Sequence, residues 1–256
     1  MKRKEVLRTG YKIAGVLLVL YALVVGMTIT LPDLKPLMQS SRNIFFHVPM
    51  WFATITLMSI SLYHSVRLLR LLDPDLDAAE YPLISDVKAE EAARIGVIFN
   101  GLGLLTGIVW SRVAWAEDRP GNEFSTWWAW DPIQVCALIA LLIYLAYFLL
   151  RSSFAEPVQR ARISAVYNIF AFAALIPLYF IIPRMFEGLH PTAGKGSFIF
   201  DRSQISNEFR IILYPGMIGF ILISVWIYEL RSRLGLLRLR LEDRQALNYF
   251  NRQSNL

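Results

Sequence analysis

The sequence predicts an all-α membrane protein: a polytopic bundle of six transmembrane helices, with both termini in the cytoplasm and a Trp-rich external loop between the third and fourth helices. The first observation is composition. Of the 256 residues, 55% are hydrophobic and only 18% are charged, whereas soluble proteins average about 45–50% apolar and about 25% charged residues. The second is that the apolar residues form six uncharged stretches, each close to the roughly 20 residues that a membrane-crossing helix needs. Together they exclude a water-soluble globule and a disordered chain.

The six stretches are interpreted as the spans of a single integral membrane domain covering residues 1–256. The first follows a basic N-terminus, but it is longer than the roughly 7–15-residue apolar core of a signal peptide, so we expect it to be retained as a span. The expected spans are about residues 13–32, 43–66, 95–111, 132–150, 163–183 and 211–228.

The positions of the charges predict the orientation of these spans. Most of the 26 Lys and Arg residues lie in the N-terminal segment, after the second and fourth spans, and in the C-terminal tail. The positive-inside rule places these segments in the cytoplasm, so the net charge of +6 reports topology and indicates no nucleic-acid partner. The external loops are then about 33–42, 112–131 and 184–210. We expect 72–94 to form an acidic cytoplasmic link and 231–247 a basic amphipathic helix on the membrane surface.

Five of the seven tryptophans lie between residues 110 and 130, in or beside the second external loop. A belt at the lipid headgroups, where indoles are favoured, accounts for three of the seven: Trp51, Trp110 and Trp226. Anchoring one helix end does not require three indoles within four positions. We therefore interpret Trp127, Trp128 and Trp130 as an apolar platform for a planar ligand.

The dipeptide Asp131-Pro132 opens the fourth span. Aspartate is a favoured N-cap and proline a favoured first helical residue, so the pair predicts a helix start. The same cap would fix the angle at which the Trp-rich loop enters the membrane.

The three histidines fall on two sides of the predicted bundle. His47 begins the second span on the external side, and His190 lies in the third external loop. His64 lies about 26 Å further along the second span, too far to share a ligand with His47. Two neutral imidazoles on one face, beside a Trp-rich loop, could fill both axial positions of a haem iron.

Haem also carries two carboxylates, which guanidinium groups bind well. Arg42 and Arg184 lie five and six residues from His47 and His190. They are the candidate propionate ligands. Arginines at the edge of a membrane also extend their charged groups to the lipid–water interface without binding any ligand. The single cysteine, Cys136, excludes a disulfide framework and a CxxC redox pair within this chain.

The segments FFHVPMW at 45–51 and STWWAWDPIQV at 125–135, followed by an external histidine, resemble the haem-handling proteins of cytochrome c maturation. The similarity is greatest to the heme exporter protein C (CcmC) type. The wider set shares a tryptophan-rich "WWD" signature and includes the CcsA and CcmF types.

The resemblance implies that haem b is held on the external face by two axial histidines and the Trp-rich loop, and is then passed to a periplasmic CcmE-type haem chaperone. It also implies CcmA/CcmB-type ABC transporter subunits and a small CcmD-type subunit as partners, in a bacterial inner membrane. By position, the axial ligands would be His47 and His190, and the platform would comprise Trp127, Trp128, Trp130 and Asp131.

Two alternatives remain open. A CcsA-like cytochrome c synthase would attach haem to apocytochrome itself with the same kind of site. A membrane b-type cytochrome would carry electrons, but such proteins place their axial histidines within the spans, whereas His190 lies outside any predicted span. No residue indicates general acid or base catalysis, so we expect a haem-presenting protein rather than an enzyme.

Overall fold

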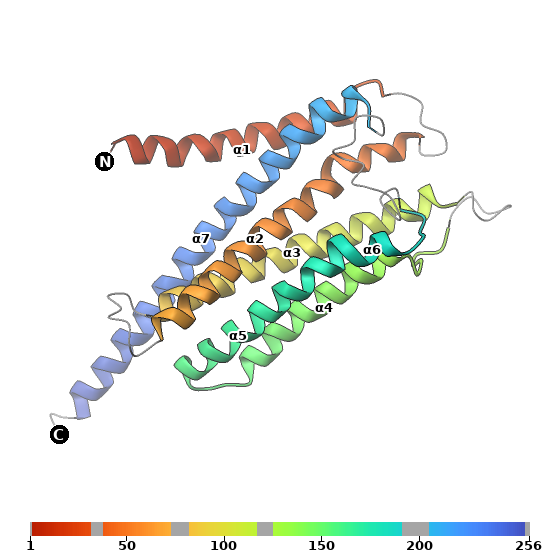
Figure 1. The fold of residues 1–256 in the computed structure, drawn as a ribbon. Helices are drawn as coiled ribbons and strands as arrows, with labels where there is room; N and C mark the ends of the chain where they lie inside the picture. The colour runs from red at the N-terminus through yellow and green to blue at the C-terminus, as the bar shows by residue number, and fades with distance from the viewer. Residues whose placement is uncertain (1, 32–37, 73–81, 117–124, 191–204, 254–256) are drawn as a thin grey trace.

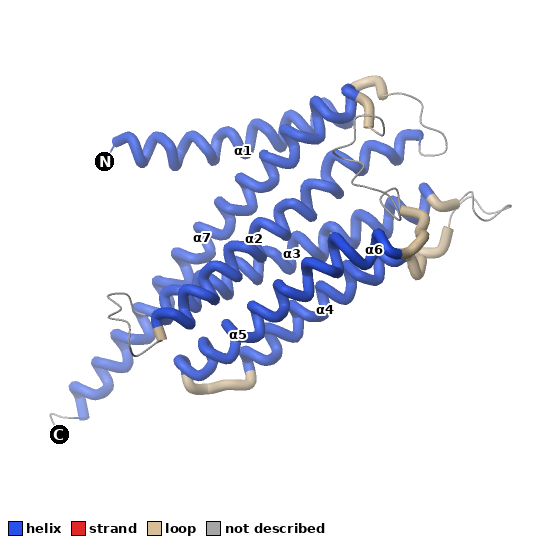
Figure 2. The backbone as a smooth tube through the Cα atoms, in the orientation of Figure 1, coloured by secondary structure: helices blue, strands red, loops and turns tan. Residues whose placement is uncertain are grey.

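The computed structural model describes residues 2–31, 38–72, 82–116, 125–190 and 205–253, and every regular element in these ranges is a helix. The all-α class is therefore confirmed (Figure 2). The elements are α1 (Lys2–Thr28), η1 (Met38–Asn43), α2 (Ile44–Leu71), α3 (Pro82–Ala114), α4 (Pro132–Ser152), α5 (Pro157–Ile176), η2 (Pro177–Ile181), α6 (Ile182–Met185) and α7 (Asn207–Gln253).

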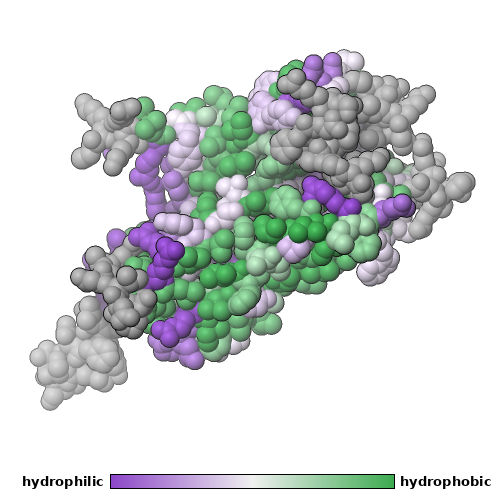
Figure 3. Space-filling view, in the orientation of Figure 1, coloured by the Kyte–Doolittle hydropathy of each residue, from purple (hydrophilic) through white to green (hydrophobic). Residues whose placement is uncertain are grey.

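Six helical segments of the described chain are long and apolar enough to cross a membrane, as predicted. Five of them are α1, η1 with α2, α3, α4 and α7, and the sixth combines α5, η2 and α6 into one span, Pro157–Met185. Figure 3 shows a hydrophobic surface over the middle of these helices, with the hydrophilic patches toward their ends. The chain is a multi-pass membrane protein.

The antiparallel pair α2 and α3 forms the centre of the bundle (Figure 1). Helices α1 and α7 pack on one side of it, and α4 and α5 on the other. We call the end that carries His47 and His190 the histidine end. The opposite end, which carries Asp86 and Arg151, is the charged end, and the start of α1 and the end of α7 lie toward it.

Small residues let α1 and α7 approach closely. A side-chain carbon added at Gly219 would lie 2.8 Å from Cβ of Leu18, and one added at Gly216 would lie 2.9 Å from Cβ of Ala22. Such close approach is what holds helices together in lipid, where apolar burial gives little driving force.

A proline supplies a hydrogen bond to the same interface. Pro215 lacks an N–H group, so the carbonyl of Ile211 has no helical donor four residues later. The hydroxyl of Tyr21 on α1 donates to that carbonyl at 3.2 Å. The side chain of one helix thus satisfies the backbone of the other, as an apolar surrounding requires.

Two expectations about the ends of the helices are wrong. Residues 82–94, expected to be part of a link, form the first turns of α3. Residues 231–247, expected to form a separate surface helix, continue α7, which is 47 residues long. Charges mark where a helix leaves the hydrocarbon but do not end it, because Lys, Arg and Glu are good helix formers.

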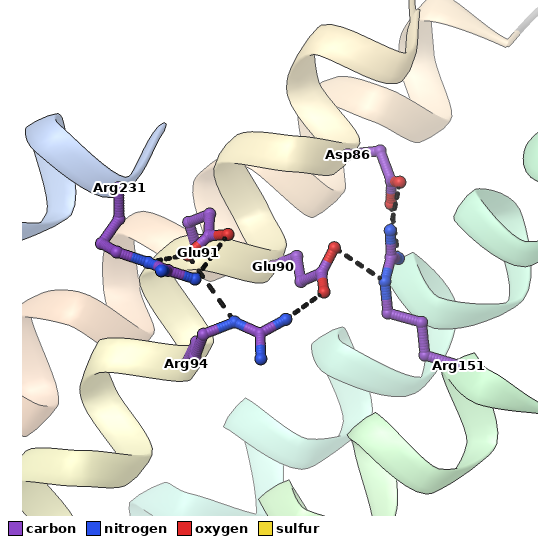
Figure 4. Close-up of polar contacts among 6 residues, drawn as sticks. All are labelled: Asp86, Glu90, Glu91, Arg94, Arg151 and Arg231. Carbon is purple, nitrogen blue, oxygen red and sulfur yellow. Dashed lines mark hydrogen bonds and ion pairs between the residues drawn. The ribbon is translucent and has the colours of Figure 1, made fainter. Parts of the chain in front are cut away.

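Ion pairs fix α4 and α7 to α3 at the charged end (Figure 4). The guanidinium of Arg151 on α4 makes two parallel hydrogen bonds to the carboxylate of Asp86 on α3, and both side chains are buried. Arg151 also lies 3.1 Å from Glu90, and Arg231 on α7 donates to Glu91 at 2.8 Å. The charges are thus paired across three helices, as buried ions require.

Candidate functional site

A mostly apolar pocket lies at the histidine end, between α2, α3, α4 and the segment that follows α6. It brings together two residues that are 143 positions apart in the chain, His47 and His190. Three tryptophans, two glycines and Gln134 surround them. The described lining is His47, Trp51, Gly103, Leu104, Gly107, Trp110, Trp115, Ile133, Gln134, Ala137 and His190.

A chain of hydrogen bonds sets the orientation and protonation of His47. The hydroxyl of Thr106 donates to the carbonyls of Leu102, at 2.8 Å, and Gly103, at 3.0 Å. A hydroxyl has one proton, so its oxygen is left to accept from Nδ1 of His47, at 2.9 Å. This pattern assigns the proton to Nδ1 and leaves a lone pair on Nε2, the arrangement that metal-binding histidines adopt.

The lone pair on Nε2 of His47 already has a partner. The indole Nε1 of Trp51, four residues later on the same face of α2, donates to it at 3.2 Å. The Trp51 ring also meets Tyr179 edge-on, with ring centroids 5.4 Å apart. Tyr179 belongs to η2, a wide turn that begins at Pro177.

Two glycines of α3 make room for the rings of α2. A side-chain carbon at Gly107 would lie 2.9 Å from Cε1 of His47, and one at Gly103 would lie 3.0 Å from the Trp51 ring. These residues are four apart and therefore share one face of α3. Because a hydrogen takes the place of each side chain, both rings can lie against the α3 backbone.

His190 reaches the pocket from outside the spans and meets Trp110 edge-on, with ring centroids 6.1 Å apart. Removal from water lowers the pKa of His190 to about 4, so its imidazole is neutral at pH 7 and able to bind a metal. Across the described residues no three His, Cys, Asp or Glu side chains gather into a metal site. The described lining of the pocket thus contains two imidazoles and no carboxylate or thiol.

The start of α4 ties the surrounding segments together. Asp131 caps the helix by accepting from the N–H of Ile133 at 2.9 Å, as predicted, and its other oxygen accepts from the N–H of Leu189 at 2.8 Å. Gln134 donates to Ser111 of α3 at 2.8 Å. One turn of α4 thus holds the residue before His190 and the end of α3.

The three tryptophans predicted to form a platform lie beside the pocket and are not among its described lining residues. Trp127 and Trp130 are 61% and 83% exposed. The guanidinium of Arg112 stacks over Trp127 at 3.9 Å, and Trp128 meets Trp130 edge-on at 6.1 Å. Trp127 and Trp130 are thus exposed and Trp128 is half-buried, in the segment that precedes the buried Asp131.

The two candidate propionate ligands also lie outside the described lining. Arg42 donates to the carbonyls of Gly26, at 2.6 Å, and Ile29, at 2.9 Å, and so caps the end of α1. Arg184 donates to the carbonyl of Phe180 one turn earlier. Their role in binding a propionate stays a prediction.

The family model for heme exporter protein C, CcmC, matches residues 3–247. The chain belongs to the heme exporter protein C family. The match covers nearly the whole chain, including every residue that lines the pocket and every predicted site residue.

Similar proteins carry the name of this family. A heme exporter protein C of Paracoccus denitrificans (strain Pd 1222) is 27% identical over 78% of this chain and 75% of its own length. One of Bradyrhizobium diazoefficiens is 30% identical over 64% of this chain and 58% of its own length. A cytochrome c biogenesis protein CcsA of Prochlorococcus marinus (strain MIT 9515) is 35% identical over 27% of this chain and 19% of its own length.

Several pocket residues of this heme exporter protein C family member are not among the predicted site residues. Trp51 and Trp110 are assigned to an aromatic belt in the sequence analysis, but they line the pocket. Gly103 and Gly107, which line the pocket, and Thr106, which hydrogen-bonds to His47, have no predicted role. Helical spacing was the available signal, because Trp51 follows His47 by four residues and Gly103, Gly107 and Trp110 share one face of α3.

Proposed function

We propose that this chain binds haem at the histidine end and passes it to a haem chaperone during cytochrome c maturation, acting as a presenting protein rather than an enzyme. The observation that carries the proposal is that His47 and His190 line one pocket. The membership of the heme exporter protein C family supports it.

The donor set fits haem b as the cargo. Nε2 of His47 has a lone pair, and His190 is neutral, so both could serve as axial ligands to the iron. The indoles of Trp51, Trp110 and Trp115 would exclude water from the haem iron. The group Trp127, Trp128 and Trp130 would meet the porphyrin edge or the chaperone, and Arg42 and Arg184 would hold the propionates.

Loading requires the pocket to open. The cavity volume is only about 20 Å³, roughly enough for one bound water. A porphyrin therefore requires side chains to move, and Trp51 is the first of them, because its indole N–H occupies the ligand nitrogen of His47. Release would reverse this exchange.

The distribution of positive charge supports a cytoplasmic location of the charged end and a periplasmic location of the histidine end. Membership of the heme exporter protein C family supports a bacterial inner membrane. We expect ABC transporter subunits of the CcmA/CcmB type and a small CcmD-type subunit as partners there. The chaperone would approach from the periplasm, where the Trp-rich surface is exposed.

The test is the visible spectrum of detergent-purified full chain titrated with haem. The wild type should give a low-spin spectrum, and His47→Gly and His190→Gly should each lose it and regain it with added imidazole. His64→Gly is the matched control, because His64 lies further along α2 and contacts Tyr228 at 3.0 Å. A double His47→Ala/His190→Ala variant that keeps the low-spin spectrum would contradict the proposal.

A cytochrome c synthase is the second candidate function, favoured by the local similarity to CcsA. Expression with an apocytochrome in a host that lacks other maturation proteins separates the two functions. Holocytochrome formed without a chaperone would favour the synthase, and its absence would favour the presenting protein.

A further inference from the structure

The face of α7 that packs against α1 continues beyond the point where α1 leaves it. The contacts pair Ala22 with Gly216, Gly15 with Leu222, and the charged groups of Arg8 and Glu229, which lie 3.7 Å apart. Figure 1 shows α1 and α7 diverging toward their ends at the charged end. At this pairing the described part of α1 would face α7 no further than about residue 235.

A row of leucines lies on this face, and its outer half, Leu237 and Leu241, lies beyond the part that α1 faces. Leu230, Leu234, Leu237 and Leu241 are 49%, 42%, 54% and 57% exposed. Their spacings of four, three and four residues place them within about 60° of one another around the helix, the pattern of a helix–helix seam. We call these four residues the leucine row.

The opposite side of α7 is fixed to the bundle. A side-chain carbon added at Gly235 would lie 2.6 Å from Val87 of α3, and Leu239 packs against the cluster that contains Leu68 and Leu83. Arg231 binds Glu91 of α3 (Figure 4). The leucine row therefore stands on a rigid helix and points away from the bundle.

Positive charge borders the leucine row on both sides. At about 100° per residue, Arg233, Arg240 and Arg244 lie along one edge and Arg238 along the other. All four side chains are exposed. Arg233 pairs with Glu229, whereas Arg238, Arg240 and Arg244 make no ion pair with the described residues. The carboxylates of Glu242 and Asp243 lie on the half of the helix that faces away from the row.

We expect the outer half of the row to lie beyond the lipid. Leu241 follows Tyr228, the last residue of the uncharged stretch, by about 20 Å along the helix. Headgroups extend only about 5–8 Å beyond the hydrocarbon core, and α7 is one continuous helix that keeps the direction of its span. A second copy of this chain would place like-charged arginines beside one another, which opposes pairing.

We propose that the leucine row docks a helix of another protein that continues the α1–α7 interface, with an apolar seam bordered by Asp and Glu. The continuity with α1, the seam spacing and the bordering arginines carry this proposal, and it does not depend on haem binding. The partner helix buries the leucines and pairs its carboxylates with Arg238, Arg240 and Arg244.

The probe is a labelled four-heptad peptide with leucine at the seam and glutamate beside it, whose like charges keep it from pairing with itself. Fluorescence anisotropy measures its binding to the full chain in nanodiscs. The peptide should bind, more weakly as salt rises. L237Q/L241Q should lower the affinity at least about tenfold, because each exposed leucine is buried on binding. E242Q/D243N, on the other half of the helix, is the matched control and should not weaken binding, because it removes no leucine and no positive charge.

A peptide with lysine in place of glutamate tests the charge. Equal binding of the two peptides, or unchanged binding by L237Q/L241Q, would overturn the proposal. A wild-type dimer that L237Q/L241Q converts to a monomer would also overturn it, in favour of a second copy. So would a spin label at L241C that is more accessible to oxygen than to a water-soluble nickel complex, since the row would then lie in lipid; the buried Cys136 leaves that label site-specific.

Discussion

The backbone N–H of Leu189 donates to Oδ2 of Asp131 at 2.8 Å, while Oδ1 of the same carboxylate caps α4. One buried side chain therefore joins a helix start to the residue that precedes His190. The bond to Leu189 reaches across 58 positions in the chain. The cap predicted from Asp131-Pro132 also positions a candidate ligand.

We expect Asp131→Asn to weaken haem binding by about tenfold, because the amide has one oxygen and can accept from only one of the two N–H groups. Asp131→Ala should weaken binding similarly and also lose the cap, which is worth about 1 kcal/mol. Haem titration and thermal unfolding of both variants measure the two effects separately. Wild-type haem affinity in Asp131→Asn would show that the bond to Leu189 does not position His190.

Thr106→Val should lower haem affinity about 10–100-fold, because the isosteric side chain removes the acceptor for Nδ1 of His47. Thr106→Ser keeps the hydroxyl and should bind like the wild type. The reduction potential of bound haem gives a second readout, since the hydrogen bond raises the basicity of the ligand. Equal affinities and potentials in Thr106→Val and Thr106→Ser would exclude this role.

Gly107→Ala should displace the His47 ring and weaken haem binding, because the added carbon would lie 2.9 Å from Cε1. Gly101→Ala is the matched control on the same helix, since no atom lies within 4 Å of its added carbon. That variant should bind haem normally and be as stable as the wild type or up to about 1 kcal/mol more stable. Identical haem titrations for the two variants would contradict the packing argument.

Arg151→Gln should lower the free energy of unfolding by about 3–5 kcal/mol, because it leaves Asp86 buried without its cation. Adding Asp86→Asn should recover part of the loss. Arg94→Gln, at a side chain that is 42% exposed, should cost about 1 kcal/mol or less. Unfolding in detergent measures all three variants, and a loss in Arg151→Gln no larger than that in Arg94→Gln would refute the assignment.

The fold was predictable because its main determinant, the length of each uncharged stretch, can be read directly along the sequence. An uncharged stretch of sufficient length crosses the membrane wherever its neighbours lie, and all six spans were found in this way. The ends of α3 and α7 were not, because helix propensity continues past the hydrocarbon boundary while hydropathy does not. Nothing in the residues of 231–247 distinguishes a surface helix from the extension of a span.

The site was only partly predictable. His47 and His190 could be proposed from their shared membrane face, and the pocket contains both. The tryptophans that line it are Trp51, Trp110 and Trp115, whereas the dense group from 127 to 130 lies beside it. The clustering of tryptophans in the sequence indicates an unusual segment but not which side chains line the pocket. That depends on how α2 packs against α3, where Gly103 and Gly107 make room for the rings of α2.

The hydrogen bond between Trp51 and His47 lowers the affinity with which the pocket would hold a ligand at Nε2 of His47. When such a ligand leaves, the indole N–H of Trp51 donates to Nε2 again, so this buried nitrogen keeps a hydrogen-bond partner in the ligand-free pocket. The free-energy difference between the bound and the ligand-free pocket is therefore small enough for an acceptor of slightly higher affinity to take the ligand, which suits transfer better than storage.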